Sequence, residues 1–239
     1  MIDRVAETKF LGVIIDDELS WKPHIANLTT KLRSCVGRIC RIRDYVPQDL
    51  CAEIYRTLYE SHLIYGISVW GGVSKNRLEP LFLTQKKCLR ILFGDRQAYK
   101  DKFKTCARAR PFGAQKLGAE FYRKENSKPL FLSNKLLTVH NLYKYHCTME
   151  TYKILKFRTP ISLYSLFQLS NRKETLLCLT RTLTNYTMNS SKLWNTYREL
   201  LKVYEFTVSV SVLKGRLKDH LISIQKLHST TEWYETDFT

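Results

Sequence analysis

An amphipathic pattern between Ile25 and Ile42 constrains the fold of this chain more than any other feature. Apolar residues recur there every three or four positions, at Ile25, Leu28, Leu32, Cys35, Ile39 and Ile42. This spacing places them along one stripe of an α-helix, and such a stripe is buried against other elements. The pattern therefore predicts a long helix within a mainly α-helical fold.

Two further helices are expected before residue 95. Pro47 breaks the first pattern, and Asp49 is a candidate N-cap for a helix that ends near Gly66. A third helix is predicted over residues 76–93, because Gly94 is a typical stop. Five apolar residues are expected to face inward: Leu78, Leu81, Phe82, Leu89 and Leu92. Four polar side chains are expected to face solvent: Gln85, Lys86, Lys87 and Arg90.

The remaining segments complete the expected architecture. Residues 9–15 are apolar and β-branched, which predicts one short buried strand followed by a turn at Asp16 and Asp17. Residues 95–132 are polar and very basic and show little periodicity, which predicts a linker. Helical spacing then returns. The expected divisions are a short β segment at residues 1–21, a helical bundle at 22–94, a linker at 95–132, a second mostly helical region at 133–227 and a tail at 228–239.

The chain carries a large excess of positive charge. Its 239 residues hold 39 Lys and Arg against 22 Asp and Glu, for a net charge of +17. Such an excess is typical of proteins with polyanionic partners, and nucleic acid is the commonest of these. Few acidic residues interrupt the cations of the first helix. The residues expected to contact phosphates are Lys22, Lys31, Arg33, Arg38, Arg41 and Arg43, with Lys86, Lys87 and Arg90 as a second patch.

Enzyme chemistry within this chain is not predicted. The sequence has no G-x-S-x-G nucleophile motif, no P-loop and no G-x-G-x-x-G motif. Its seven cysteines are scattered without C-x-x-C spacing, which predicts reduced thiols and no zinc site. We therefore expect no catalytic residue, no bound metal, no cofactor and no small-molecule substrate.

The pair Asp16 and Asp17 follows two isoleucines, as catalytic carboxylates follow apolar residues in some polymerases. A two-metal site also needs a carboxylate from a separate upstream strand. Only Asp3 and Glu7 precede the pair. We therefore interpret Asp16 and Asp17 as a turn that ends a strand.

Membrane and export signals are not seen. No apolar stretch reaches the roughly 18 residues of a membrane span, and the first ten residues contain no apolar leader region. The expected location is intracellular, nuclear or cytoplasmic, without secretion and without a membrane partner.

Short motifs in a fixed order resemble the region that follows the catalytic segment of non-LTR (LINE-type, jockey-like) retrotransposon reverse transcriptases. The resemblance covers about residues 8–93 and continues more thinly beyond them. The motifs are KFLGVIID from Lys9 to Asp16, Leu19-Ser20-Trp21, His24-Ile25, Ile54-Tyr55, Leu58, Ser61, Leu63, Tyr65-Gly66, Val69-Trp70-Gly71, Gln85-Lys86-Lys87, Arg90-Ile91, Leu193-Trp194-Asn195 and the residues from Leu213 to Leu221.

The resemblance implies a function for each part of the chain. Residues 1–21 would be the end of the polymerase palm, with a primer-grip-like strand at Phe10, Leu11, Gly12 and Val13, and residues 22–94 would be the helical thumb that holds the template–primer duplex. The parent enzymes use Mg²⁺ for RNA-directed DNA synthesis. The fingers, the palm strands and their catalytic carboxylates are not found in this sequence. A fragment without activity of its own is therefore expected, with sequence-independent binding of an RNA–DNA or DNA duplex as its residual role.

The missing palm and fingers would then be a second partner. Two alternatives stay open at this point: a protein-interaction or structural module derived from a retroelement, and a non-functional pseudogene product.

Overall fold

The computed structural model describes residues 5–94, 127–167, 169–170, 173–177, 185–200, 206 and 208–227. These residues form a mainly α-helical structure with short antiparallel strand pairs, which confirms the predicted fold class. The elements are β1 (Glu7–Phe10), β2 (Val13–Asp16), α1 (Lys22–Ile42), η1 (Arg43–Tyr45), η2 (Gln48–Leu50), α2 (Cys51–Ile54), η3 (Tyr55–Glu60), α3 (Ser61–Ile64), α4 (Ile67–Trp70), α5 (Lys75–Phe93), α8 (Lys128–Ser133), α9 (Val139–Phe157), α10 (Ile161–Tyr164), β3 (Leu169–Ser170), β4 (Lys173–Leu177), α11 (Asn185–Leu200) and α12 (Val210–Leu227).

The N-terminal apolar run forms a hairpin, so the prediction of one buried strand is wrong. β1 pairs with β2 in antiparallel register, with Phe10 opposite Val13. The two-residue loop between them, Leu11 and Gly12, has φ of 46° and 86°. Positive φ at both loop residues matches the right-handed twist of paired strands, and Gly12 adopts it without steric cost. Here turn geometry overrides the apolar composition of the run.

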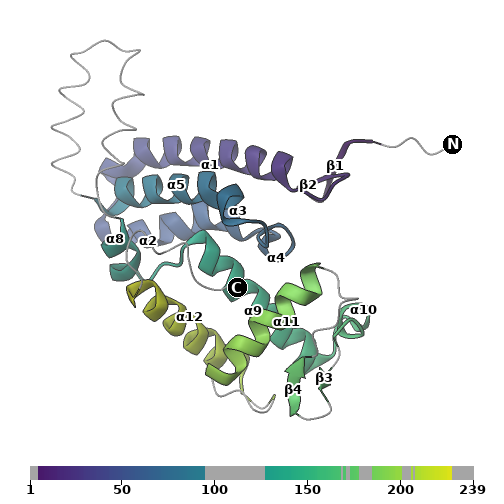
Figure 1. The fold of residues 1–239 in the computed structure, drawn as a ribbon. Coiled ribbons are helices and arrows are strands. Elements are labelled where there is room, and N and C mark those ends of the chain that lie inside the picture. Colours follow the sequence, from purple (N-terminus) through teal and green to yellow (C-terminus); the bar gives the residue numbers. More distant parts are fainter. Residues whose placement is uncertain are drawn as a thin grey trace.

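Helices α1 and α5 form the first layer and lie side by side in the same direction (Figure 1). Arginines tie both of their ends together. At the start of the pair, Arg77 donates to the carbonyl of Ser20 at 2.8 Å. At its end, Arg43 donates to the carbonyl of Gly94 at 2.6 Å. The register of the two helices is thereby fixed at both termini.

The segment between α1 and α5 is less regular than the single helix expected. It consists of the 3₁₀ turn η2, the short helix α2, the six-residue π-helix η3 and the short helix α3. The N-cap position of η2 is Pro47 and that of α2 is Leu50, so the prediction of Asp49 as an N-cap is wrong. Tyr55 and Tyr59 of η3 are completely buried and stack with ring centroids 5.5 Å apart.

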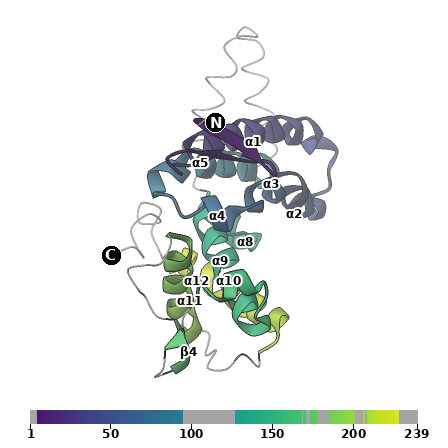
Figure 2. The ribbon, with the colours of Figure 1, turned by 90° about the vertical axis from the view of Figure 1, so that its right-hand side faces the viewer.

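The C-terminal region packs around α9, which contacts α4 and α5 above it and α11 and α12 below it (Figures 1 and 2). Thr138 caps this helix by accepting from the backbone N–H of Asn141. Trp194 is buried between Tyr152 and Phe206, with its ring 6.0 Å from that of Phe206. α8 overlaps the end of the stretch expected to be a linker and buries Phe131, so residues 128–132 are helical and not a linker. The linker's other residues from 95 to 126, and the tail, lie outside the described residues.

A pair of glycines lets the two regions approach each other closely. A Cβ on Gly71 would lie 2.7 Å from the Tyr143 ring, and one on Gly72 would lie 2.7 Å from the Tyr143 hydroxyl. A Cβ on Gly71 would also lie 2.5 Å from the backbone oxygen of Ile67, so a larger residue at Gly71 would force the backbone to shift. The Val69-Trp70-Gly71 motif is therefore the point at which α4 meets the C-terminal region.

Candidate nucleic-acid interface

The outer surface of α1 carries an exposed group of cations. Lys31, Arg38 and Arg41 are all exposed, and their spacing of seven and ten residues keeps them on one face of the helix. We call these three residues the α1 basic face. Lys22 and Arg33 are also exposed but lie on the opposite flank of the outer surface. The 21 residues of α1 include no acidic side chain.

Arg38 is positioned by its neighbour on the same helix. Its guanidinium donates to the Sγ atom of Cys35 at 2.9 Å. Cys35 itself is buried, with 1% of its surface exposed. One end of the guanidinium is therefore anchored to the helix, while its other donors face outward.

Arg43, which was predicted to contact phosphates, does not belong to this exposed face. Its side chain is 1% exposed and bonds the carbonyl that ends α5. A cation near a helix C-terminus interacts favourably with the last carbonyls and the helix dipole. Arg43 lies four residues after the buried Ile39 and keeps helical dihedral angles, so it continues the buried stripe of α1.

The second predicted patch is not a uniform exposed surface. Lys87 is exposed, whereas Lys86 and Arg90 are half-buried. The ammonium of Lys86 lies 3.9 Å from the centroid of the Phe82 ring, and burial lowers its pKa. Gln85 is completely buried, so the prediction that it faces solvent is wrong.

The four primer-grip-like residues lie at the turn of the N-terminal hairpin. Phe10 and Leu11 are 63% and 74% exposed, so their apolar surfaces are largely uncovered in this chain. The Tyr65 hydroxyl donates to the carbonyl of Leu11 at 2.5 Å and holds the turn against the α3–α4 connection. Val13 is half-buried and Gly12 is exposed. The turn therefore has a fixed position with an apolar outer surface.

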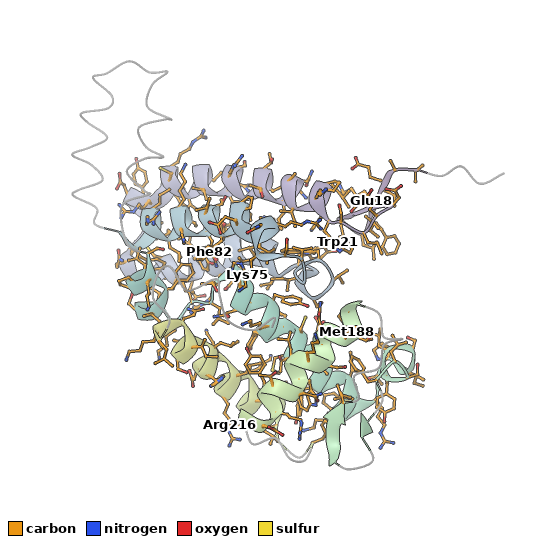
Figure 3. The ribbon with its side chains drawn as sticks, in the orientation of Figure 1. Glu18, Trp21, Lys75, Phe82, Met188 and Arg216 are labelled. Carbon is orange, nitrogen blue, oxygen red and sulfur yellow. The ribbon has the colours of Figure 1, made fainter. Side chains whose placement is uncertain are left out.

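Asp16 is the last residue of β2, and the expected turn begins at Asp17. Its carboxylate accepts from the backbone N–H groups of Ser20 and Trp21, both at 2.9 Å. Hydrogen bonding to Ser20 is the main cause that lowers the Asp16 pKa. The carboxylate thereby fixes the loop that leads into α1, near Glu18 and Trp21 in Figure 3. Within the described ranges no three His, Cys, Asp or Glu side chains gather as metal ligands.

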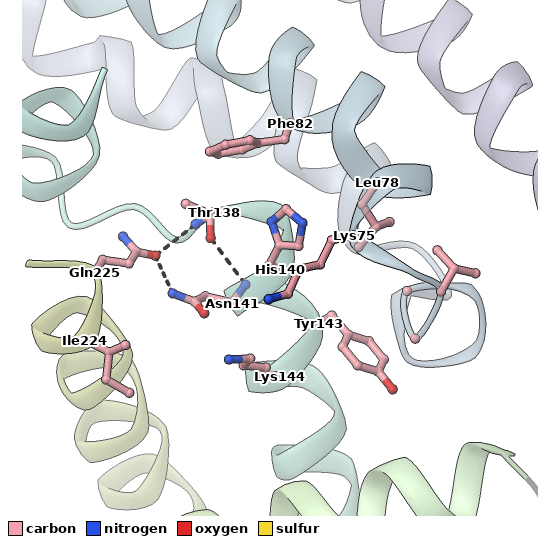
Figure 4. Close-up of a pocket in the computed structure, with 13 residues that line it drawn as sticks. Lys75, Leu78, Phe82, Thr138, His140, Asn141, Tyr143, Lys144, Ile224 and Gln225 are labelled. Atoms are coloured by element: carbon pink, nitrogen blue, oxygen red, sulfur yellow. Dashed lines mark hydrogen bonds between the residues drawn. The ribbon is translucent and has the colours of Figure 1, made fainter. Parts of the chain in front are cut away.

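Sequence reasoning did not find a pocket between α5, α9 and α12 (Figure 4). Its lining comes from residues 71–82, 138–144 and 224–225, which lie far apart in the sequence. Three of the side chains that line it are basic: Lys75, His140 and Lys144. No local motif signals such a pocket, because the three helices meet only after folding.

None of the described helices is both long and apolar enough to cross a bilayer.

Comparison with known proteins supports a relationship to retrotransposon polymerases. The chain is 29% identical over 89 residues to the RNA-directed DNA polymerase from mobile element jockey of Drosophila melanogaster, which is 36% of this chain and 10% of that protein. The jockey polymerase of Drosophila funebris is 28% identical over 97 residues, 39% of this chain and 11% of that protein. The probable RNA-directed DNA polymerase from transposon X-element of Drosophila melanogaster is 25% identical over 89 residues, 36% of this chain and 10% of that protein.

The chain spans about a tenth of the length of these curated relatives. No protein-family model matches it, and no solved structure matches it. The similarity confirms the resemblance carried by the ordered motifs. Over more than a third of its length, the chain is similar to the RNA-directed DNA polymerases of non-LTR retrotransposons.

Proposed function

We propose that this chain binds the template–primer duplex of a retrotransposon polymerase through the α1 basic face, as a thumb domain does. The observation that carries the proposal is the placement of Lys31, Arg38 and Arg41 on one exposed face of a helix that has no acidic residue. The similarity to RNA-directed DNA polymerases supplies the class of ligand.

The dimensions of the helix suit a nucleic-acid backbone. A rise of 1.5 Å per residue separates Lys31 from Arg41 by about 15 Å along the helix axis. Phosphates of one strand follow one another at about 3.4 Å along the duplex axis, so this span covers several of them. Contacts to phosphates fix position without reading sequence. Binding is therefore expected to be indifferent to sequence and sensitive to salt.

The proposal assigns binding and positioning to this chain. DNA synthesis, with its Mg²⁺ ions, would be carried out by the polymerase portions that the relatives have in addition. The hairpin turn supports a contact with such a portion, because Phe10 and Leu11 present uncovered apolar surface there. Exposed apolar surface of this kind typically marks a protein contact. We therefore propose the polymerase palm as the protein partner of the turn.

The test compares two double charge reversals that change the net charge equally. Arg38→Glu with Arg41→Glu alters the α1 basic face. Lys214→Glu with Arg216→Glu alters two exposed cations on α12 and serves as the matched control. Affinity for a fluorescent RNA–DNA hybrid of arbitrary sequence is measured by anisotropy for each folded variant.

The α1 variant is expected to bind at least tenfold more weakly than the wild type, and the α12 variant is expected to lose much less. Equal losses would mean that binding follows net charge and not the α1 basic face. An unchanged affinity of the α1 variant would refute the assignment directly.

A further inference from the structure

An exposed aromatic ring stands at the C-terminal end of the α1 basic face. Tyr45, the last residue of η1, has 88% of its surface exposed, more than any other large apolar or aromatic side chain in the described part of the chain. By contrast, Tyr55, Tyr59 and Tyr152 are completely buried. Packing in the core therefore does not account for an aromatic residue at position 45.

Helical spacing places this ring in line with the cations. Tyr45 follows Arg41 by four positions and Arg38 by seven, and both spacings return to the same side of a helix. η1 continues α1 directly, because Arg43 keeps helical dihedral angles. Ile42, three positions before Tyr45, is 37% exposed and adds apolar surface beside the ring. The α1 basic face therefore ends in an apolar surface about 7 Å beyond Arg41 along the axis.

The backbone that carries the ring is anchored on both sides. Arg43, two positions earlier, is buried and donates to the carbonyl of Gly94 at 2.6 Å. Val46, the next residue, is half-buried against the core, and its N–H donates to the carbonyl of Arg43 at 3.3 Å. Tyr45 is therefore an exposed ring on a fixed turn. Such preorganisation lowers the entropy cost of binding.

An aromatic ring beside phosphate-binding cations can recognise an unpaired base. The bases of an intact duplex stack on one another, whereas an unpaired base presents its face to an aromatic side chain. Proteins that bind single strands combine such stacking with cations that follow the backbone. The neighbouring Asp44 lies about 100° away around the helix axis, so it belongs to a different side of the helix.

We propose that Tyr45 stacks on the first unpaired base beyond the duplex that the α1 basic face binds. This inference rests on the proposed function and adds the class of duplex, which is one that continues into a single strand, as a template does beyond the end of its primer. Arg38 and Arg41 contact phosphates of the paired part, and the Tyr45 ring contacts the base that follows. A duplex that stays paired on both sides offers no such base.

The test uses two fluorescent RNA–DNA hybrids with the same short template overhang, which carries bases in one hybrid and abasic sugars in the other. The two hybrids have the same phosphates and differ only in the bases available for stacking. Anisotropy measures the affinity of the full chain for both hybrids, in the wild type, Tyr45→Ala and Tyr45→Phe. Phe157→Ala is the matched control, because Phe157 is also an exposed aromatic residue at the end of a helix but lies on α9. Thermal unfolding establishes that each variant is folded.

The wild type is expected to bind the hybrid with bases at least fivefold more tightly than the abasic one, which is the lower end of the range for one stacked base. Tyr45→Ala is expected to remove this preference and to leave affinity for the abasic hybrid unchanged. Tyr45→Phe and Phe157→Ala are expected to keep the preference. The inference is overturned if the wild type shows no preference, if Tyr45→Ala loses affinity equally for both hybrids, or if Tyr45→Phe behaves like Tyr45→Ala.

The same titrations separate this inference from the proposed function. A wild type that binds neither hybrid would overturn both. Equal, salt-sensitive binding of the two hybrids by the wild type would support the α1 basic face and overturn the role of Tyr45 alone.

Discussion

Gln85 of α5 and Gln225 of α12 hold the same short segment, residues 136–139, from two sides. Gln85 donates to the carbonyl of Leu137 at 2.9 Å and accepts from the N–H of Val139 at 2.9 Å. Gln225 donates to the carbonyl of Leu136 at 3.1 Å and accepts from the N–H of Thr138 at 3.0 Å. All of these groups are buried, so Gln85 joins α5 to this segment of the C-terminal region and Gln225 joins α12 to the same segment.

Replacing Gln85 by Ala is expected to destabilise the fold strongly. The Tyr55 hydroxyl, the Leu137 carbonyl and the Val139 N–H would each lose a buried partner. Such unsatisfied groups cost roughly 1–3 kcal/mol each, and partial relaxation limits the sum to about 3 kcal/mol. Urea unfolding measures the loss, with the exposed Gln48→Ala as the control. A loss below about 1 kcal/mol would contradict the role assigned to this amide.

Two glycine-to-alanine changes are expected to have opposite signs. Gly37 lies exposed within α1, and a Cβ there meets nothing within 4 Å. Gly37→Ala is therefore expected to stabilise by about 0.5–1 kcal/mol through helix propensity. At Gly71, a Cβ would lie 2.5 Å from the Ile67 carbonyl oxygen and 2.7 Å from the Tyr143 ring. Gly71→Ala is expected to destabilise by about 1–3 kcal/mol, as overpacking does.

Thermal unfolding of the two variants checks this prediction. A higher Tm for Gly37→Ala and a lower Tm for Gly71→Ala are expected. Equal shifts in one direction would show that α4 does not approach α9 as closely as described.

Arg41 and Arg43 are expected to separate binding from folding, although they are only two positions apart in the sequence. Arg43 is buried and bonds the Gly94 carbonyl, so Arg43→Ala is expected to cost about 2 kcal/mol of stability. Arg41 is exposed, so Arg41→Ala is expected to change stability by less than about 0.5 kcal/mol while weakening duplex binding. Denaturant unfolding and anisotropy on the same samples provide both measurements. Weaker binding by an equally stable Arg43→Ala would place that side chain in the interface after all.

His140 is expected to make stability depend on pH in the acidic range. Its pKa falls from 6.5 to about 4 on folding, so between these values the unfolded chain carries the proton and the folded chain does not. The free energy of unfolding therefore falls by about 1.4 kcal/mol for each pH unit below 6.5 and stops falling near pH 4. The groups that oppose protonation are Lys144, Lys75 and Lys86, together with burial.

The measurement compares unfolding free energies from pH 7 to pH 4 for the wild type and His140→Gln. Between pH 7 and pH 4, the unfolding free energy of the wild type is expected to fall further than that of His140→Gln, by on the order of 3 kcal/mol. His62→Gln is the control, because His62 is exposed on α3. Identical pH profiles for the wild type and His140→Gln would contradict the buried, neutral imidazole.

Helical periodicity predicted the elements that bury one continuous apolar stripe. Leu32 and Ile39 of α1, and Leu217 and Leu221 of α12, are completely buried or nearly so, as their spacing indicates. The buried face of such a helix follows from the spacing of its apolar residues, which can be read directly from the sequence. The ordered motifs likewise predicted the related polymerases.

Polar residues were predicted less well, because their burial depends on partners that are distant in sequence. Gln85 is polar and was expected to face solvent, but it bonds a backbone segment more than fifty positions away. Arg43 finds its partner carbonyl at Gly94. The hairpin depended on positive φ at Leu11, a residue type that rarely marks such a turn. The pocket around Lys75 required three helices to meet, which no local pattern encodes.

The most direct test of the central claim is the salt dependence of hybrid binding by the α1 basic face. Affinity of the wild type and of Arg38→Gln with Arg41→Gln is measured for an RNA–DNA hybrid at several salt concentrations. Each phosphate neutralised contributes about −0.9 to the log–log slope, so the double variant is expected to have a slope shallower by about 2 and a lower affinity at each salt concentration. Parallel slopes with equal affinities would contradict phosphate binding by Arg38 and Arg41.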